Sequence, residues 1–229
     1  EHPREMIDKS QYGESYKLLP PASYKLTYTT KENRGVYSFC MCPGGHVVNA
    51  SSEEGMLAVN GMSYHDRDSE NANSALIVTV TPEDYIPYGT SDMPKELYGV
   101  SFQRELEKRA YLAGDGKIPV QLFKDYKEHK VSDTFGEITP CMKGHYTFGD
   151  VRGIFPDFIG DTIEEGITAF GRKIKGYDRD DAIISGVESR SSSPVRILRN
   201  DDFESDFSGI YPCGEGAGYA GGITSAAID

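Results

Sequence analysis

The spacing of apolar residues changes along this chain, and that change limits the fold more than any other sequence feature. Up to residue 80 the chain has short runs rich in β-branched and aromatic residues, which are typical of strands. From 98 to 110, and again from 155 to 174, apolar residues recur about every fourth position, which is typical of amphipathic helices. Strands, then helices, then short extended runs predict an α+β (mixed α/β) fold, with helices packed on a mixed β-sheet.

The boundaries of the expected elements follow from turn residues and from this spacing. Pro94 precedes the first long helical repeat and Gly114 lies where that helix should end. Pro119 is expected to begin a short amphipathic helical piece, and 130–156 an irregular connection. The predicted strands are 24–30, 36–41, 46–50, 56–60, 75–80, 182–187, 194–199 and 209–213, and a last helix is expected over 222–229.

The charge balance and the hydropathy exclude two classes of partner. Asp and Glu number 36 against 24 Lys and Arg, and the basic residues form no cluster, so we expect no nucleic-acid partner. Mean hydropathy is −0.50 and no window approaches ~18 consecutive apolar residues, so we expect no membrane span. Four cysteines in a chain of this length do not indicate a disulfide-rich secreted domain, and we therefore expect reduced thiols and a cytoplasmic location.

Cysteine and histidine spacing points to no metal or nucleophilic site. Cys40 and Cys42 precede His46, but no second ligand pair has matching spacing, and on a strand both cysteines share one face as small half-buried residues. We expect Cys42 and Cys213 to be packing residues rather than redox thiols. The histidines are scattered and suggest no triad, so no catalytic residue is assigned: His2, His46, His65, His129 and His145.

The strongest local motif is a glycine-rich segment near the end of the chain, 209–222. Gly216, Gly218 and Gly221 satisfy G-x-G-x-x-G between a predicted strand and a predicted helix, which is the setting of a phosphate-binding turn. A dinucleotide fingerprint should have an acidic residue about 20 positions later, and only eight residues follow Gly221. The motif alone leaves a phosphate cradle and a plain strand-to-helix turn both open.

Five longer blocks, in order over nearly the whole chain, carry a family resemblance. The first is YSFCMCPGG at 37–45 and the last is YPCGEGAGYAGG at 211–222; the others are 60–63, 71–75 and 188–196. Together they resemble the bacterial FAD-dependent dehydrogenases, also called NAD(P)/FAD-dependent oxidoreductases, whose substrates are largely unassigned.

The resemblance implies that this chain is part of a longer protein and contains two parts with different roles. Residues 1–185 would form an inserted substrate-type α+β domain, and 186–229 would supply a C-terminal strand, glycine turn and helix that complete an FAD-binding domain. The true dinucleotide fingerprint would lie in an N-terminal half that precedes Glu1. We expect the chain alone to hold FAD weakly and to show no turnover. Its partners would be that missing half, a small-molecule substrate and, as a second nucleotide, NAD(P)H.

By similarity, two groups of residues become candidate sites. Asn60-Gly61 is also a strong tight-turn signal, and Arg190 could equally pair with a nearby acid, so a structural role stays open for both. The candidate substrate residues are Asn60, Arg67, Asn73, Arg190 and Arg196. The candidate cofactor residues are Gly214, Glu215, Gly216, Gly218, Gly221, Gly222 and Ile223.

Two alternative functions remain open at this point. The chain could be a non-catalytic globular domain that binds a small anion or a partner protein. It could also be a nucleotide-binding domain built on 216–221 alone, although the missing acidic residue argues against this.

Overall fold

The computed structural model describes residues 1–190 and 192–229, so Ser191, within the 188–196 block, lies outside the described residues. The chain divides into two compact units. Unit 1 consists of Glu1–Thr81 and Arg104–Glu188, and unit 2 consists of Pro82–Gln103 and Ser189–Asp229. The assignment of 186–229 to an FAD-binding domain stays a prediction.

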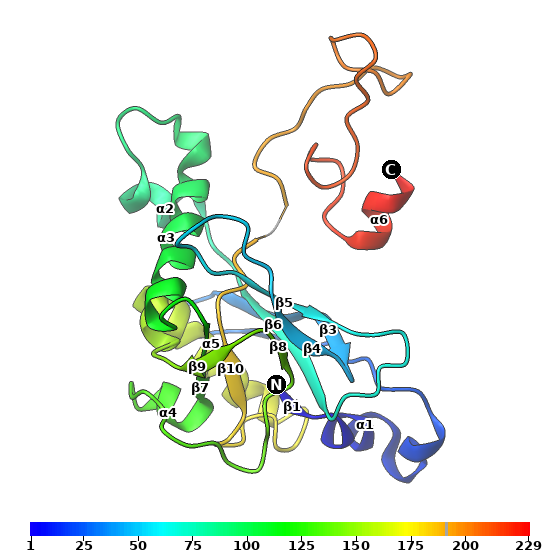
Figure 1. Cartoon of the computed structure of the whole chain (residues 1–229), viewed down its shortest axis with the longest axis vertical. Coiled ribbons are helices and arrows are strands. Elements are labelled where there is room, and N and C mark those ends of the chain that lie inside the picture. The colour runs from blue at the N-terminus through cyan, green and yellow to red at the C-terminus, as the bar shows by residue number, and fades with distance from the viewer. Residues whose placement is uncertain (191) are drawn as a thin grey trace. The chain divides into compact units, whose positions relative to one another are not determined.

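Three β-sheets form the framework of unit 1 (Figure 1). The largest is an antiparallel sheet in the order β1-β6-β3-β2, made of His2–Pro3, Asn71–Val78, Gly35–Pro43 and Thr27–Thr29. The second has the order β10-β7-β9, made of Ile183–Ser185, Ile118–Leu122 and Tyr146–Phe148. The third has the order β5-β4-β8, made of Val59–Met62, His46–Asn49 and Met142–Lys143. In the two smaller sheets, β7 runs parallel to β9 and β4 runs parallel to β8.

Helix α5, Asp157–Gly171, packs against β2, β3 and β6 of the largest sheet. Its buried stripe includes Ile159, Ile163, Ile167 and Phe170, as the four-residue repeat predicted. A Cβ added at Gly166 would lie 2.6 Å from Val36 Cγ1. The glycine therefore lets the helix backbone approach the sheet closely.

The other helical segments are shorter, except for α3. Unit 1 contains α1 (Arg4–Tyr12), η1 (Gly13–Leu18), α4 (Phe123–Lys127) and η4 (Arg152–Ile154). Unit 2 contains α2 (Pro82–Tyr85), η2 (Ile86–Tyr88), η3 (Lys95–Leu97) and α6 (Ile223–Ile228). Helix α3 spans Tyr98–Ala113 and contributes residues to both units. No helix in the described part of the chain combines the length and the apolar character needed to cross a bilayer.

The predicted α+β fold class is confirmed, while several local predictions differ from the structure. Residues 118–122 form strand β7, with all five side chains buried, and not the start of a helical piece. Pro119 stands inside this strand, where its fixed φ is tolerated because extended backbone has a compatible φ. Helix α1 was not predicted, and the supposedly irregular 130–156 contains β8, β9 and η4.

The strands predicted at 194–199 and 209–213 are wrong. Among the described residues of unit 2 none lies in a strand, so these runs have no strand with which to pair. Pro194 and Pro212 also remove one backbone donor from each run. The final helix is confirmed, because α6 begins at Ile223 (Figure 1).

Candidate functional site

An irregularity in strand β3 places two of the resemblance blocks side by side. Phe39 pairs with Ala75 and Cys42 with Asn73, so β3 holds one more residue than β6 between these two pairs. Cys40, inside the irregularity, has a left-handed φ of 44°. Such a bulge bends a strand and redirects its side chains. Here it brings Cys42 of β3 opposite Asn73 of β6.

Two glycines after β3 allow direct contact between two loops. Gly44 has a φ of 68°, and a Cβ there would lie 1.8 Å from the carbonyl oxygen of Arg67. A Cβ at Gly45 would lie 2.5 Å from the carbonyl oxygen of Met62. The hydroxyl of Ser69 donates to the carbonyl of Gly45 at 2.6 Å. Any side chain at these glycines would therefore separate the loops.

A third glycine brings β5 against the same pair of side chains. A Cβ at Gly61 would lie 2.4 Å from Asn73 Oδ1 and 3.3 Å from Cys42 Sγ. Strands β3, β5 and β6 therefore meet at Gly61. The blocks at 37–45, 60–63 and 71–75 converge on this one place.

Asn73 is buried, with 4% of its surface exposed, and its Nδ2 has no hydrogen-bond partner. Asn71, two residues earlier on β6, is equally buried but donates to the carbonyl of Thr139 at 2.8 Å and to Glu1 Oε1 at 3.2 Å. An unpaired buried donor destabilises a folded chain by about 1–3 kcal/mol. Unpaired buried polar groups are rare and call for an explanation, of which a binding role is one.

Glu188 adds a carboxyl to the same place. The carbonyl of Val187 accepts a hydrogen bond from Val59 N at 2.9 Å, which fixes the chain before Glu188 beside β5. Burial raises the pKa of the Glu188 carboxyl to about 7. Burial first, and then the charges of Cys40 and Glu188, raise the pKa of the Cys42 thiol. We call Cys42, Gly61, Asn73 and Glu188 the strand-end cluster.

A carboxyl with a pKa near neutrality can both give and accept a proton under ordinary conditions. The Cys42 thiol, whose pKa is raised, is held in its protonated form and is a poor nucleophile. The cluster therefore offers one proton-exchanging group, one amide donor and one thiol.

Of the predicted substrate residues in unit 1, only Asn73 belongs to the cluster. Asn60 and Arg67 are exposed, and Arg67 has a left-handed φ of 50°. Arg67 still lies close enough to counter the rise in the pKa of Cys42. Sequence reasoning missed Glu188 as a separate site residue, although it begins the 188–196 block. The substrate-binding roles of these residues stay predictions.

The cysteines and His46 form no visible cation site. All four cysteines are free thiols. Within the part of the chain that the structure describes, no three His, Cys, Asp or Glu side chains are grouped to hold a metal ion. His46 instead packs edge-on against Tyr64, with ring centroids 5.6 Å apart.

In unit 2, residues 214–222 form a tight turn that we call the glycine turn. Gly214 and Gly218 have left-handed φ values of 67° and 82°, and a Cβ at Gly218 would lie 2.4 Å from Val195 O. At Gly216, by contrast, an added Cβ would meet nothing within 4 Å. The turn is fixed at its flanks and open in between.

The remaining predicted cofactor residues border this open backbone. Glu215, Gly221 and Ile223 are exposed. Gly222 is the N-cap of α6, and its N–H donates to Ser225 Oγ at 3.2 Å. The cofactor-binding roles of these residues stay predictions.

The two predicted arginines of unit 2 differ in their surroundings. Arg190 is exposed. Arg196 donates from Nε to the carbonyl of Gly218 at 3.1 Å and lies 4.8 Å from the ring centroid of Tyr219. Arg196 therefore supports the glycine turn in this structure. Arg199, which the sequence did not single out, stacks on Tyr219 of the same turn and donates to the carbonyl of Pro212, just before it.

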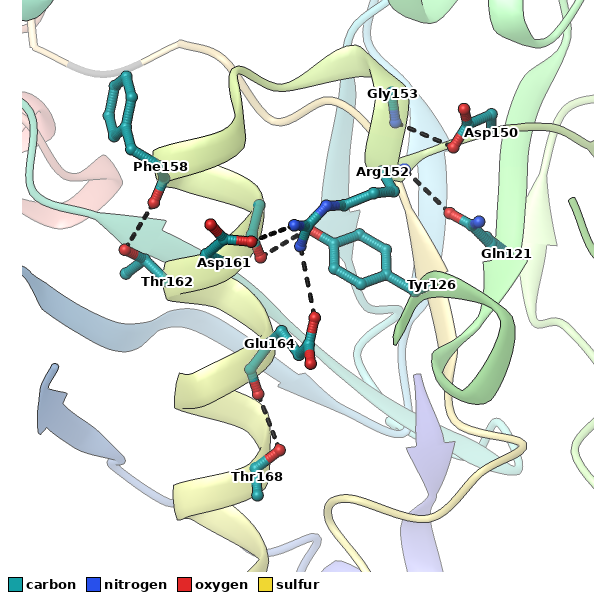
Figure 2. Close-up of polar contacts among 11 residues, drawn as sticks. Gln121, Tyr126, Asp150, Arg152, Gly153, Phe158, Asp161, Thr162, Glu164 and Thr168 are labelled. Carbon is teal, nitrogen blue, oxygen red and sulfur yellow. Dashed lines mark hydrogen bonds and ion pairs between the residues drawn. The ribbon is translucent and has the colours of Figure 1, made fainter. Parts of the chain in front are cut away.

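A second polar cluster surrounds Arg152, a buried residue of η4, the short helical turn that precedes α5 (Figure 2). Its guanidinium pairs with Asp161, lies 3.6 Å from Glu164 Oε2 and 5.2 Å from the ring centroid of Tyr126. Its backbone N–H donates to Gln121 Oε1 at 2.9 Å. These contacts join α5 to β7 and α4, which is a structural role.

Unit 1 also has a surface cleft of about 470 Å³ beside α1. Three cationic side chains line it, but so do four carboxylates, and the cleft therefore has no strong charge preference. Its charged residues are Arg4, Glu5, Asp8, Lys17, Asp66, Arg67 and Asp68.

Comparison with known proteins gives two matches. Residues 1–191 match the family described as "FAD-dependent protein, C-terminal domain-like". A protein of Clostridium beijerinckii, named only as an uncharacterized protein, is 51% identical over 235 residues. That match includes all of this chain and 43% of the relative, so the chain spans less than half the length of the curated relative it matches.

Proposed function

The chain belongs to the FAD-dependent protein C-terminal domain-like family, and from this membership we propose that it is the substrate-facing part of an FAD-dependent oxidoreductase. In this proposal 1–185 form the substrate-type domain and 186–229 complete the FAD-binding domain. The full-length protein would be cytoplasmic and would contain an N-terminal half with the main FAD contacts. NAD(P)H is the proposed second nucleotide.

The observation that carries this proposal is the strand-end cluster. Four of the resembling blocks contribute residues to it, and it holds both an unpaired buried amide and a carboxyl whose pKa burial raises to about 7. Both features reduce stability, and neither is needed to close the sheets. Groups that lower stability without a structural purpose are expected mainly at functional sites.

The residues of the glycine turn also suit the binding of FAD. The open backbone at Gly216 leaves room for a phosphate or ring to approach, whereas a side chain there would fill that space. We propose that 214–223 hold FAD through backbone groups, with Glu215 and Ile223 beside it. Bound FAD supplies hydride or electron transfer, while this chain positions the substrate. Asn73 would donate a hydrogen bond to the substrate and Glu188 would exchange a proton with it, with Asn60, Arg67, Arg190 and Arg196 as further candidate contacts.

One substitution tests the flavin role without disturbing the fold. Gly216→Val meets open space, so the thermal midpoint of the protein without flavin should stay unchanged. In the full-length protein the affinity for FAD should fall by about tenfold or more, because the side chain occupies the approach of the ligand. Equal FAD affinity in wild type and variant would refute the proposal.

A simpler experiment tests the need for the missing half. The purified full-length protein should be yellow, with absorbance near roughly 450 nm, as flavoproteins are. The 229-residue chain alone should be colourless and show no turnover. A colourless full-length protein that takes up no added FAD would contradict the flavin assignment.

The alternative function is a non-catalytic domain that binds a small anion or a protein. The cleft beside α1, whose lining carries both cationic and acidic side chains, is the place where such a small molecule or a segment of a partner protein could bind. It predicts anion or partner binding that survives in the chain alone and that substitutions at Gly216 leave unchanged.

A further inference from the structure

Arg199 contacts Pro212 before the glycine turn, Tyr219 within it and Asp229 after it. We propose that Arg199 is a positioning residue that holds this turn with its backbone open to a ligand. The inference rests on the proposed flavin-contacting role of the turn. Arg199 itself would act through the residues it orders and would not touch the flavin.

The hydrogen bonds of Arg199 define its geometry. Nη1 donates to the carbonyl of Pro212 at 2.7 Å and to Asp229 Oδ2 at 3.0 Å, and Nη2 donates to Asp229 Oδ1 at 2.7 Å. The carboxylate is thus held by two parallel bonds, an arrangement that a lysine cannot reproduce. The side chain of Arg199 is only 10% exposed, so this pair is better shielded from solvent than an ordinary surface pair.

Asp229 links Arg199 to Gly214, the first residue of the glycine turn. Its Oδ2 accepts the N–H of Gly214 at 2.9 Å. Gly214 in turn accepts, at its carbonyl, the N–H of Tyr219 at 3.1 Å. Because Gly214 has a left-handed φ of 67°, its conformation is one that these bonds select from the many that glycine can adopt.

Stacking fixes the other side of the turn. The Arg199 guanidinium lies 3.8 Å from the ring centroid of Tyr219, whose hydroxyl donates to the carbonyl of Ile197 at 3.1 Å. The N–H of Ile197 donates to the carbonyl of Ala217 at 3.1 Å. At Gly216, between these anchored residues, an added Cβ would meet nothing within 4 Å.

This arrangement orders the turn before any ligand arrives. A turn held by Arg199 loses little further conformational entropy on binding, whereas a free glycine-rich loop would lose a large amount. Arg199 should therefore strengthen ligand binding without contributing a contact of its own.

Hydrogen exchange of the chain alone tests the ordering step without any flavin. Arg199→Leu should accelerate exchange at the amides of Gly214, Gly218 and Tyr219 by about tenfold, as expected from losing a charge-assisted bond pair. Arg104→Leu is the matched control, because Arg104 also pairs with a carboxylate, Glu53, at 3.3 Å in the other unit. Unchanged exchange at the turn in Arg199→Leu would overturn the inference.

Flavin binding to the full-length protein tests the positioning step. Arg199→Leu should raise the dissociation constant of FAD about tenfold and alter the visible circular dichroism of bound flavin. Arg199→Lys keeps the charge but not the two parallel bonds, so it should not restore the wild-type values.

The outcomes separate the two proposals. If wild type binds FAD and Arg199→Leu binds it equally well with an unchanged dichroism spectrum, the positioning role is wrong while the proposed function stands. If wild type binds no FAD, the proposed function is wrong. The exchange experiment then decides by itself whether Arg199 orders the turn.

Discussion

Asn71 and Asn73 on strand β6 provide a matched pair for testing the unpaired amide of the strand-end cluster. Both are 4% exposed, but only Asn71 has partners for its amide nitrogen. The perturbation is leucine at each position, because leucine is the apolar residue closest to asparagine in shape and has no polar atoms. The two variants therefore differ mainly in what happens to hydrogen bonding.

The expected effects have opposite signs. Asn73→Leu removes a buried donor without a partner, which recovers up to about 1–2 kcal/mol of the penalty that such a group imposes. Asn71→Leu removes two bonds and leaves the Thr139 carbonyl without that donor, which should cost about 1–3 kcal/mol. For a chain of this size each kcal/mol corresponds to roughly 2–4 °C in thermal midpoint.

Urea unfolding at pH 7, followed by circular dichroism, measures both free energies against wild type. A destabilisation of Asn73→Leu equal to that of Asn71→Leu would refute the reasoning, because it would mean that the Asn73 amide is paired. In the full-length protein Asn73→Leu should nevertheless lose substrate affinity or turnover. Gain of stability with loss of function is the pattern expected of a binding residue.

Three further predictions concern Glu188, Gly61 and Arg152 of unit 1. The folded chain holds a proton on Glu188 up to about pH 7, whereas an unfolded glutamate loses it near its ordinary pKa of 4.5. The free energy of unfolding should therefore fall as the pH rises from 4.5 to about 7. Glu188→Gln should abolish this fall, which is smaller than about 3 kcal/mol because the carboxyl is partly exposed to solvent. The urea midpoint of the variant should therefore exceed that of wild type at about pH 8 and match it at about pH 4. Parallel pH curves for the two proteins would contradict the raised pKa. Gly61→Ala should lower the free energy of unfolding by roughly 1–3 kcal/mol, and with it the thermal midpoint, since its Cβ would lie 2.4 Å from Asn73 Oδ1. Gly216→Ala, the control in unit 2, should leave both unchanged. Arg152→Leu should destabilise unit 1 by about 2–3 kcal/mol in the same urea assay, below the ~3–5 kcal/mol of a fully buried broken pair, because Asp161, its closest partner, is 69% exposed and rehydrates; a neutral variant would show that the pair does not anchor α5.

The sequence predicted well those elements whose own periodicity decides their structure. Helix α5 has a four-residue apolar repeat long enough to exclude a strand, and β6 includes a continuous apolar run bounded by polar turns. Strand β7 was misassigned because Pro119 is a helix-start signal in isolation. Its five buried residues become a strand through pairing with β9 and β10, which are distant in sequence.

The sequence indicated residue types of the candidate site but not their arrangement. Asn73 and the glycines were recognised through the resembling blocks, but their convergence depends on the irregularity at Cys40 and on the loop contact at Gly44. The importance of Glu188 comes from its burial, which sequence does not reveal for a single acidic residue. Arg199 has no local signal at all, because its partners, Pro212, Tyr219 and Asp229, lie 13 to 30 positions away.

The strand-end cluster concentrates two costs in one place. An unpaired amide at Asn73 and a desolvated carboxyl at Glu188 each lower the free energy of unfolding near neutral pH, and apolar residues of similar size would avoid both. A ligand that accepts a hydrogen bond from Asn73 and exchanges a proton with Glu188 would satisfy both groups at once. Relief of both costs would add to the binding free energy, so ligand binding should raise the thermal midpoint of wild type more than that of Asn73→Leu.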